Sequence, residues 1–124
     1  MNFDQTSQSE VNNSQSVNLT NENFVQEVIE KSKSIPVIVD FWAPWCEPCK
    51  QIAPILDKLV ASSNGRVVLT KMNIDEHPEI SQQLQIQSIP AILGFHNGQP
   101  VDGFVGVQPE SAIKAFKSDR NVKY

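Results

Sequence analysis

The 124-residue chain is long enough for one sizeable hydrophobic core, and 40% of its residues are apolar. It carries 10 basic and 14 acidic side chains, and the formal net charge of -4 argues against nucleic acid or an anionic membrane as the main partner. No apolar run approaches the length of a bilayer span, and the N-terminus lacks the basic and apolar regions of a secretory signal. We therefore expect one monomeric domain in the cytoplasm.

The first half of the chain predicts a tail, a helix and a buried strand. Residues 1–16 are mostly Asn, Gln, Ser and acidic residues, which is typical of a flexible tail. Residues 19–34, LTNENFVQEVIEKSKS, have helical spacing with Thr20 or Asn21 as the expected N-cap. The run IPVIVDFW, residues 35–42, is nearly continuous and β-branched, so it predicts a strand buried on both faces.

The rest of the chain alternates between helical and extended patterns. A helix is expected over residues 46–62, with a kink at Pro54, and a strand over residues 66–74. Pro78 opens a short helix with His77 near its cap. A hairpin and a last helix follow, formed by the strands 91–96 and 100–106, the turn Asn97-Gly98 and the helix 108–118, which Pro109 opens.

These elements predict an α/β fold. The strand–helix–strand unit at residues 36–73 implies a parallel pair with a right-handed crossover, and the hairpin adds an antiparallel pair. The result is a central mixed β-sheet with helices on both faces. We assign residues 17–118 to this domain, and residues 119–124 form its C-terminal end.

Both cysteines of the chain lie in FWAPWCEPCK, where Cys46 and Cys49 are separated by Glu47 and Pro48. Cys46 follows a buried strand and opens a helix, where first-turn N–H groups and the helix dipole favour a thiolate. Cys49 lies one turn later on the same side, where we expect the helix to shield it, and Pro48 suits the first turn. An exposed attacking thiol beside a buried resolving thiol indicates thiol–disulfide exchange.

Three other interpretations of the pair are weaker. A zinc site needs about four ligands, and His77 and His96 lack suitable spacing, so we expect no metal. A structural disulfide would close only a tiny loop, which contributes little. Two inert core thiols remain an alternative, although the position between a buried strand and a helix favours redox chemistry.

Two charged residues interrupt apolar strands. Asp40 lies six residues before Cys46, and burial there should raise its pKa so that it can transfer a proton at neutral pH. We hypothesise that Asp40 takes the proton of Cys49. Lys71 interrupts the strand 66–74 and is expected beside Asp40; the alternative is that both side chains face solvent at sheet edges. Pro90, which follows Ile89 at a strand start, is most simply a turn or edge residue.

Together these features resemble the thioredoxin family over about residues 17–118. The resemblance rests on VDFWAPWCEPCKQIAPIL, KMNID, the SIP segment before a strand, and the Asn-Gly turn with Gly106 after it. It implies a disulfide reductase in which Cys46 is the nucleophile and Cys49 the resolving thiol, cycling through a Cys46–Cys49 disulfide with no bound cofactor.

The resemblance also implies roles for surrounding residues. Asp40 is the buried acid, Lys71 its neighbour and Pro90 a cis-proline against the disulfide. The backbone of Ile89 pairs with the substrate chain. Trp42 and Trp45 match the tryptophans that flank the site, although Trp42 serving only in packing remains an alternative.

Parts of the sequence depart from the family pattern. The usual CGPC is CEPC here, and Ala91 stands where Thr commonly follows the cis-proline. The stretch HNGQPVDGFVGVQPESAIKAF resembles the thioredoxin domain of chaperedoxins, bacterial co-chaperones with tetratricopeptide repeats after that domain. The sequence reaches Tyr124 without such repeats, so an isolated domain and a free-standing thioredoxin remain alternatives.

Two functions are therefore expected. The first is reduction of protein disulfides. The chain has no Gly-rich dinucleotide motif, so its electrons must come from a partner. The resemblance to the thioredoxin family implies that this partner is an NADPH-dependent flavoprotein thioredoxin reductase. The alternative is a holdase that binds unfolded clients or chaperones. Glu47 should raise the pKa of Cys46 relative to glycine by less than about one unit, or it is a solvated charge without redox effect.

Overall fold

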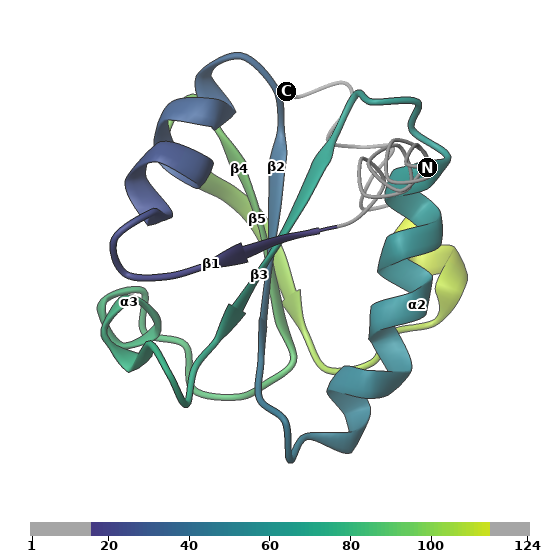
Figure 1. Cartoon of the computed structure of the whole chain (residues 1–124). Coiled ribbons are helices and arrows are strands. Elements are labelled where there is room, and N and C mark those ends of the chain that lie inside the picture. Colours follow the sequence, from purple (N-terminus) through teal and green to yellow (C-terminus); the bar gives the residue numbers. More distant parts are fainter. Residues whose placement is uncertain (1–15, 115–124) are drawn as a thin grey trace, which may run out of the picture.

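The computed structural model describes residues 16–114, which form a five-stranded sheet in the order β1-β3-β2-β4-β5 (Figure 1). The central strand β2 pairs in parallel with β3 and antiparallel with β4, so the predicted mixed sheet is confirmed. The strands are β1 (Val17–Leu19), β2 (Val37–Trp42), β3 (Val68–Asn73), β4 (Ala91–His96) and β5 (Gln99–Val105).

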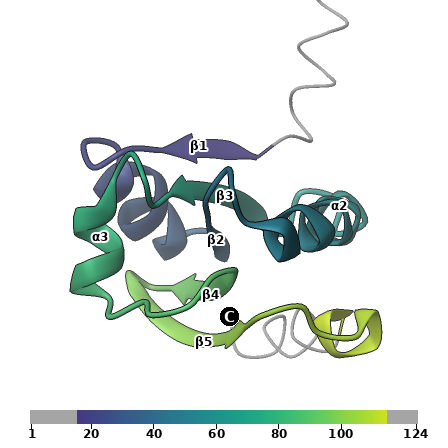
Figure 2. The ribbon, with the colours of Figure 1, turned by 90° about the horizontal axis from the view of Figure 1, so that it is seen from below.

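Helices cover both faces of the sheet, as expected (Figure 2). One face carries the π-helix η1 (Val25–Glu30), the short 3₁₀-helix η2 (Lys31–Lys33) and α3 (Pro78–Gln83). The other face carries α2 (Glu47–Ala61) and the helical residues 110–114. The β2–α2–β3 unit is the predicted parallel crossover, and α2 connects the two strands that are central to the site.

Each face has its own apolar core, because alternate residues of a strand point to opposite sides of the sheet. On the η1 side, Val37, Val39 and Phe41 of β2 are buried, whereas Ile38 faces α2. The five consecutive residues 37–41 are all buried, which confirms that β2 is covered on both faces. Asp40 shares the α2 face with Ile38, so a carboxyl group lies at the edge of an otherwise apolar layer.

The N-terminal part of the domain differs from the prediction. Residues 17–19 form β1, which pairs with β3, rather than leading into a helix. The following helix is a π-helix whose N-cap residue is Phe24, without a side-chain cap. Thr20 and Asn23 instead bond reciprocally through side chain and backbone, at 2.7 and 3.0 Å. Thr20 therefore makes the side-chain bond expected of an N-cap, although the residue directly before the assigned helix is Phe24.

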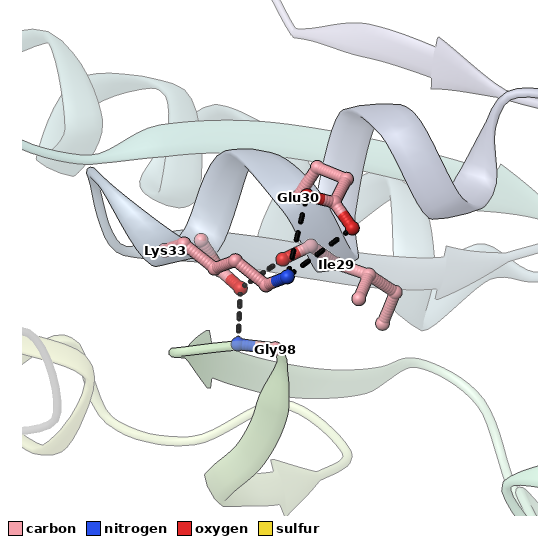
Figure 3. Close-up of polar contacts among 5 residues, drawn as sticks. Ile29, Glu30, Lys33 and Gly98 are labelled. Atoms are coloured by element: carbon pink, nitrogen blue, oxygen red, sulfur yellow. Dashed lines mark hydrogen bonds and ion pairs between the residues drawn. The ribbon is translucent and has the colours of Figure 1, made fainter.

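The β4–β5 hairpin is confirmed, with Asn97 and Gly98 both at positive φ, as its tight turn requires. The fully buried Ser32 anchors this turn, because its Oγ accepts the Gly98 N–H at 2.8 Å and donates to the Ile29 carbonyl at 3.0 Å. Figure 3 shows Gly98 beside Ile29, with the neighbouring Lys33–Glu30 ion pair. A serine therefore connects the π-helix side of the fold to the hairpin.

The remaining helix boundaries agree well with the sequence. Cys46 is the N-cap of α2 and Ser62 its C-cap, and Pro54 lies inside the helix. His77 is the N-cap of α3, which begins at Pro78. Of the last predicted helix, residues 110–114 are helical, and its remainder lies outside the described residues, as do the tail up to residue 15 and the end segment 119–124.

Candidate active site

The two cysteines lie where β2 gives way to α2. Cys46 and Cys49 are joined in a disulfide with their Cα atoms 5.3 Å apart. The Cys49 backbone N–H donates to the Cys46 sulfur at 3.2 Å, so this sulfur occupies the N-cap position of α2. Glu47 and Pro48 form the first turn of the helix, where the missing N–H of proline costs nothing. The predicted strand-to-helix setting is confirmed.

Both cysteines of the disulfide are shielded from solvent. Cys46 and Cys49 are each 3% exposed, and together with Ala43 they form a small apolar cluster. Trp42, Ile74 and Ile89 pack against this cluster. In the disulfide form the expected difference in exposure between the two cysteines is therefore wrong, because the apolar neighbours cover both.

Asp40 and Lys71 lie opposite each other on β2 and β3, as predicted. Asp40 is 1% exposed and sits on the central strand, so the alternative of a solvent-facing edge position is wrong for it. Burial raises the pKa of Asp40 to about 7, with Lys71 opposing and Asp57 reinforcing this rise. One carboxylate oxygen, Oδ1, has no hydrogen-bond partner. A carboxyl group in this state can accept a proton at neutral pH.

A cavity of about 170 Å³ is lined by both Asp40 and Cys49. Its lining residues come from β2, α2 and β3: they are Asp40, Trp42, Cys49, Lys50, Ala53 and Lys71. The volume exceeds what one water molecule needs. Asp40 and Cys49 therefore line the same cavity.

Asp57 was not identified from the sequence. It lies on α2, and its Oδ1 is 4.0 Å from the Nζ of Lys71. The signal was the spacing of Cys49, Ala53 and Asp57, which at intervals of four residues share one helix face. An isolated acid on an exposed helix face does not by itself point to chemistry.

The two tryptophans occupy different environments. Trp42 is half-buried and forms part of the cavity wall, whereas Trp45 is 64% exposed. The Trp45 Nε1–H donates to Asp75 Oδ2 at 3.0 Å, which ties the indole to the turn after β3. Asp75 was also missed, although Asn73 marks the turn that holds it: the Asn73 Oδ1 accepts the Asp75 backbone N–H at 2.9 Å.

The segment before β4 lies next to the disulfide. Ile89 packs against the cysteine cluster, and the Ile89–Pro90 peptide bond is cis. Pro90 lies in a bend directly before β4, which agrees with its interpretation as a turn residue. Because β4 lies between β2 and β5, the alternative of an edge position is wrong. The Gly106 N–H donates to the Pro90 carbonyl at 2.8 Å, which ties the end of β5 to this segment.

Glu47 lies in the first turn of α2, one residue after Cys46. Its Oε2 is 3.2 Å from the Nζ of Lys50, and both side chains are largely exposed, at 76% and 59%. An exposed ion pair of this kind is screened and contributes little to stability. Lys50 nevertheless offsets part of the negative charge that Glu47 brings to the disulfide.

Residues 16–114 contain neither a cluster of metal ligands nor a membrane-spanning helix. Within this range no three His, Cys, Asp or Glu side chains are grouped so that they could hold a metal ion. No helix in the same range has the length and apolar character needed to cross a membrane.

The chain is similar to known proteins over nearly the whole range that the structure describes. Residues 15–119 match the family model described as Thioredoxin. The chain is 41% identical to Thioredoxin 1 of Nostoc sp. over 95 residues. This aligned region spans 77% of this chain and 87% of that protein. It is 44% identical over 96 residues to a thioredoxin of Rickettsia felis, spanning 77% and 90%.

A third relative combines two activities in its name. The chain is 36% identical over 103 residues to the bifunctional thioredoxin reductase/thioredoxin of Mycobacterium leprae. The match spans 83% of this chain and 22% of that protein.

Proposed function

The chain belongs to the thioredoxin family and is a thiol–disulfide oxidoreductase with a redox-active Cys46–Cys49 disulfide; from this premise we propose the roles of its residues. Cys46 is the attacking thiol and Cys49 the resolving thiol. Asp40 takes up the proton of Cys49. The observation that carries this assignment is the shared cavity, because it places Asp40 and Cys49 in one compartment while the Cys46 sulfur occupies the helix N-terminus.

The reaction proceeds in two exchanges. The Cys46 thiolate attacks one sulfur of a protein disulfide, the substrate S–S bond breaks, and a substrate thiolate leaves. Cys49 then loses its proton to the Asp40 carboxylate and attacks the Cys46 sulfur. The Cys46–Cys49 disulfide forms and the second substrate thiolate is released. The substrate gains two electrons, and the protein dithiol is oxidised.

The two exchange steps of the mechanism depend on different structural features. The Cys49 N–H at the Cys46 sulfur and the dipole of α2 stabilise negative charge on that sulfur. Burial raises the pKa of Asp40 to about 7, so that its carboxylate is basic enough to take up a thiol proton near neutral pH. The first feature serves attack and the second serves release, so the two can be tested separately.

The substrate site is proposed to surround the disulfide. Ile89 would pair with the substrate backbone beside Pro90, and Gly106 leaves room at the neighbouring strand end, because it carries no side chain. Trp45 supplies an exposed apolar surface held in place by its hydrogen bond. Pro48 shapes the first helical turn. Lys71 and Trp42 support the site from the cavity wall, and Glu47 tunes it from the rim.

Partners and cellular context follow from the same chemistry. The family implies protein disulfide substrates and a thioredoxin reductase. The Mycobacterium leprae relative, whose name joins a thioredoxin reductase to a thioredoxin, supports such a reductase as the donor. We infer that the donor is an NADPH-dependent flavoprotein. A reductive cycle that uses such a donor fits a cytoplasmic, monomeric protein. The family match over residues 15–119 supports the proposed domain 17–118.

Insulin reduction tests the proposed activity. The full chain, with dithiothreitol or with NADPH and a thioredoxin reductase, should precipitate the insulin B chain faster than reductant alone. The Cys46→Ser/Cys49→Ser variant should give only the background rate. An equal rate for both proteins would reject the proposed reductase activity.

A holdase of the chaperedoxin type is the second candidate. Three valines on or after β5 expose large apolar side chains: Val101 is 46%, Val105 54% and Val107 43% exposed. Such side chains can bind unfolded clients. Suppression of citrate synthase aggregation by both the wild type and the double serine variant would support this function. Loss of suppression in the double variant would assign it to the thiols instead.

A further inference from the structure

The carboxylate of Asp57 lies close to the lysine that faces the buried acid. Asp57 occupies the same face of α2 as Cys49, two turns further along. Its Oδ1 is 4.0 Å from Lys71 Nζ, and the Lys71 side chain is 18% exposed while that of Asp57 is 52% exposed. Lys71 also lines the cavity that contains Asp40 and Cys49. Lys71 therefore lines the cavity of the buried carboxyl group while its ammonium pairs with an exposed carboxylate.

Lys71 is engaged with the outer carboxylate. Asp40 and Lys71 are opposite each other in the β2–β3 register, yet among the ion pairs of residues 16–114 the partner within 4.0 Å of Lys71 Nζ is Asp57. Asp40 Oδ1 meanwhile has no hydrogen-bond partner. The register thus places Lys71 opposite Asp40, whereas its ion pair is with Asp57.

We propose that Asp57 is a positioning residue, which pairs with the Lys71 ammonium and thereby keeps it out of a direct ion pair with Asp40. This inference rests on the proposed role of Asp40 as proton acceptor. The charged groups that face the cavity around Asp40 are Lys71 from β3 and Lys50 from α2, with Asp57 behind Lys71. Lys50 is itself paired with Glu47, so Lys71 is the cation whose position matters most.

The expected consequence of this arrangement is that the Asp40 carboxylate remains a strong enough base to remove a thiol proton. A direct ion pair between a carboxylate and a cation lowers the pKa of the acid by about 1–3 units, and a weaker base removes a thiol proton less readily. Burial raises the pKa of Asp40, Lys71 lowers it and Asp57 raises it. Asp57 therefore helps Asp40 to remain basic both through its own charge and by holding the lysine.

Asp57→Asn tests the inference in the full chain. The measurement is the rate at which Cys49 resolves a mixed disulfide between Cys46 and glutathione, followed over about pH 5–9. The inflection due to Asp40 should move down by about one pH unit, and the high-pH plateau should fall. Asp57→Glu should restore most of the wild-type profile. Glu30→Gln, which removes an acid on the opposite face of the sheet, should leave it unchanged.

Two further variants separate the possible failures. In a Lys71→Met background, Asp57→Asn should produce a smaller shift, because the lysine through which Asp57 acts is gone. An inflection that stays in place or moves up in Asp57→Asn would overturn the inference. An inflection that persists in Asp40→Asn would instead overturn the role of Asp40 in the proposed function, whatever Asp57 does.

Discussion

Replacing Asp40 with Asn should make the protein more stable and a slower reductase. Burial raises the pKa of Asp40 from 3.8 to about 7, a shift that corresponds to about 4 kcal/mol. The folded state therefore binds the Asp40 proton more tightly than the unfolded chain does. The stability that this proton contributes is complete below about pH 4 and is lost as the pH rises to about 7.

The variant has no such titration, so the pH dependence identifies the effect. The free energy of unfolding of Asp40→Asn, relative to wild type, should rise by up to about 4 kcal/mol between about pH 4 and pH 8. Asn carries its own cost, because a buried amide without partners costs about 1–3 kcal/mol, but this cost does not vary with pH. The comparison across pH is therefore more informative than any single value.

Urea unfolding of the oxidised protein, followed by far-UV circular dichroism, provides the measurement. Glu22→Gln removes an exposed acid and should show no such pH-dependent difference from wild type. The same Asp40→Asn protein should resolve mixed disulfides more slowly at pH 7. A difference in unfolding free energy that is constant across pH would refute the reasoning from burial, and an unchanged resolution rate would refute the catalytic role.

Two other substitutions probe the site rim and the fold. Glu47→Gly should lower the pKa of Cys46 by less than about one unit, measured from thiolate absorbance of the reduced protein, and a rise would reverse the assigned sign. Ser32→Ala should lower the free energy of unfolding by about 1–3 kcal/mol, because the Gly98 N–H loses its acceptor in a buried site. Ser34→Ala removes an exposed hydroxyl that makes a similar local bond and should cost less than about 0.5 kcal/mol, so equal losses would contradict the anchoring role of Ser32.

Strong local patterns made much of the fold predictable from sequence. The continuous β-branched run of β2 indicated a strand covered on both faces, and Asn97-Gly98 indicated the hairpin turn. The strand β1 was missed because three residues with one buried side chain carry no periodic signal. The π-helix was missed because the apolar residues in 25–30 have the spacing of an ordinary α-helix, and the sequence does not reveal the different hydrogen-bond spacing.

Some residues of the site could likewise be predicted from the sequence, whereas others could not. Cys46, Cys49 and Asp40 could be identified because each breaks an expectation of its segment: paired thiols at a helix start, and an acid inside an apolar strand. Asp57 and Asp75 could not, because an acid on an exposed helix face or in a turn is ordinary until its partner is known. The equal burial of the cysteines likewise depends on residues that are distant in sequence, such as Ile89.

Trapping of substrate by single cysteine variants tests the central claim most directly. Reduced Cys49→Ser and Cys46→Ser proteins are incubated with oxidised insulin and separated on non-reducing gels. Cys49→Ser should accumulate a mixed disulfide that dithiothreitol releases, because Cys46 attacks and no resolving thiol follows. Cys46→Ser should accumulate none. Trapping by Cys46→Ser alone, or by neither variant, would contradict the account of Cys46 as the attacking thiol.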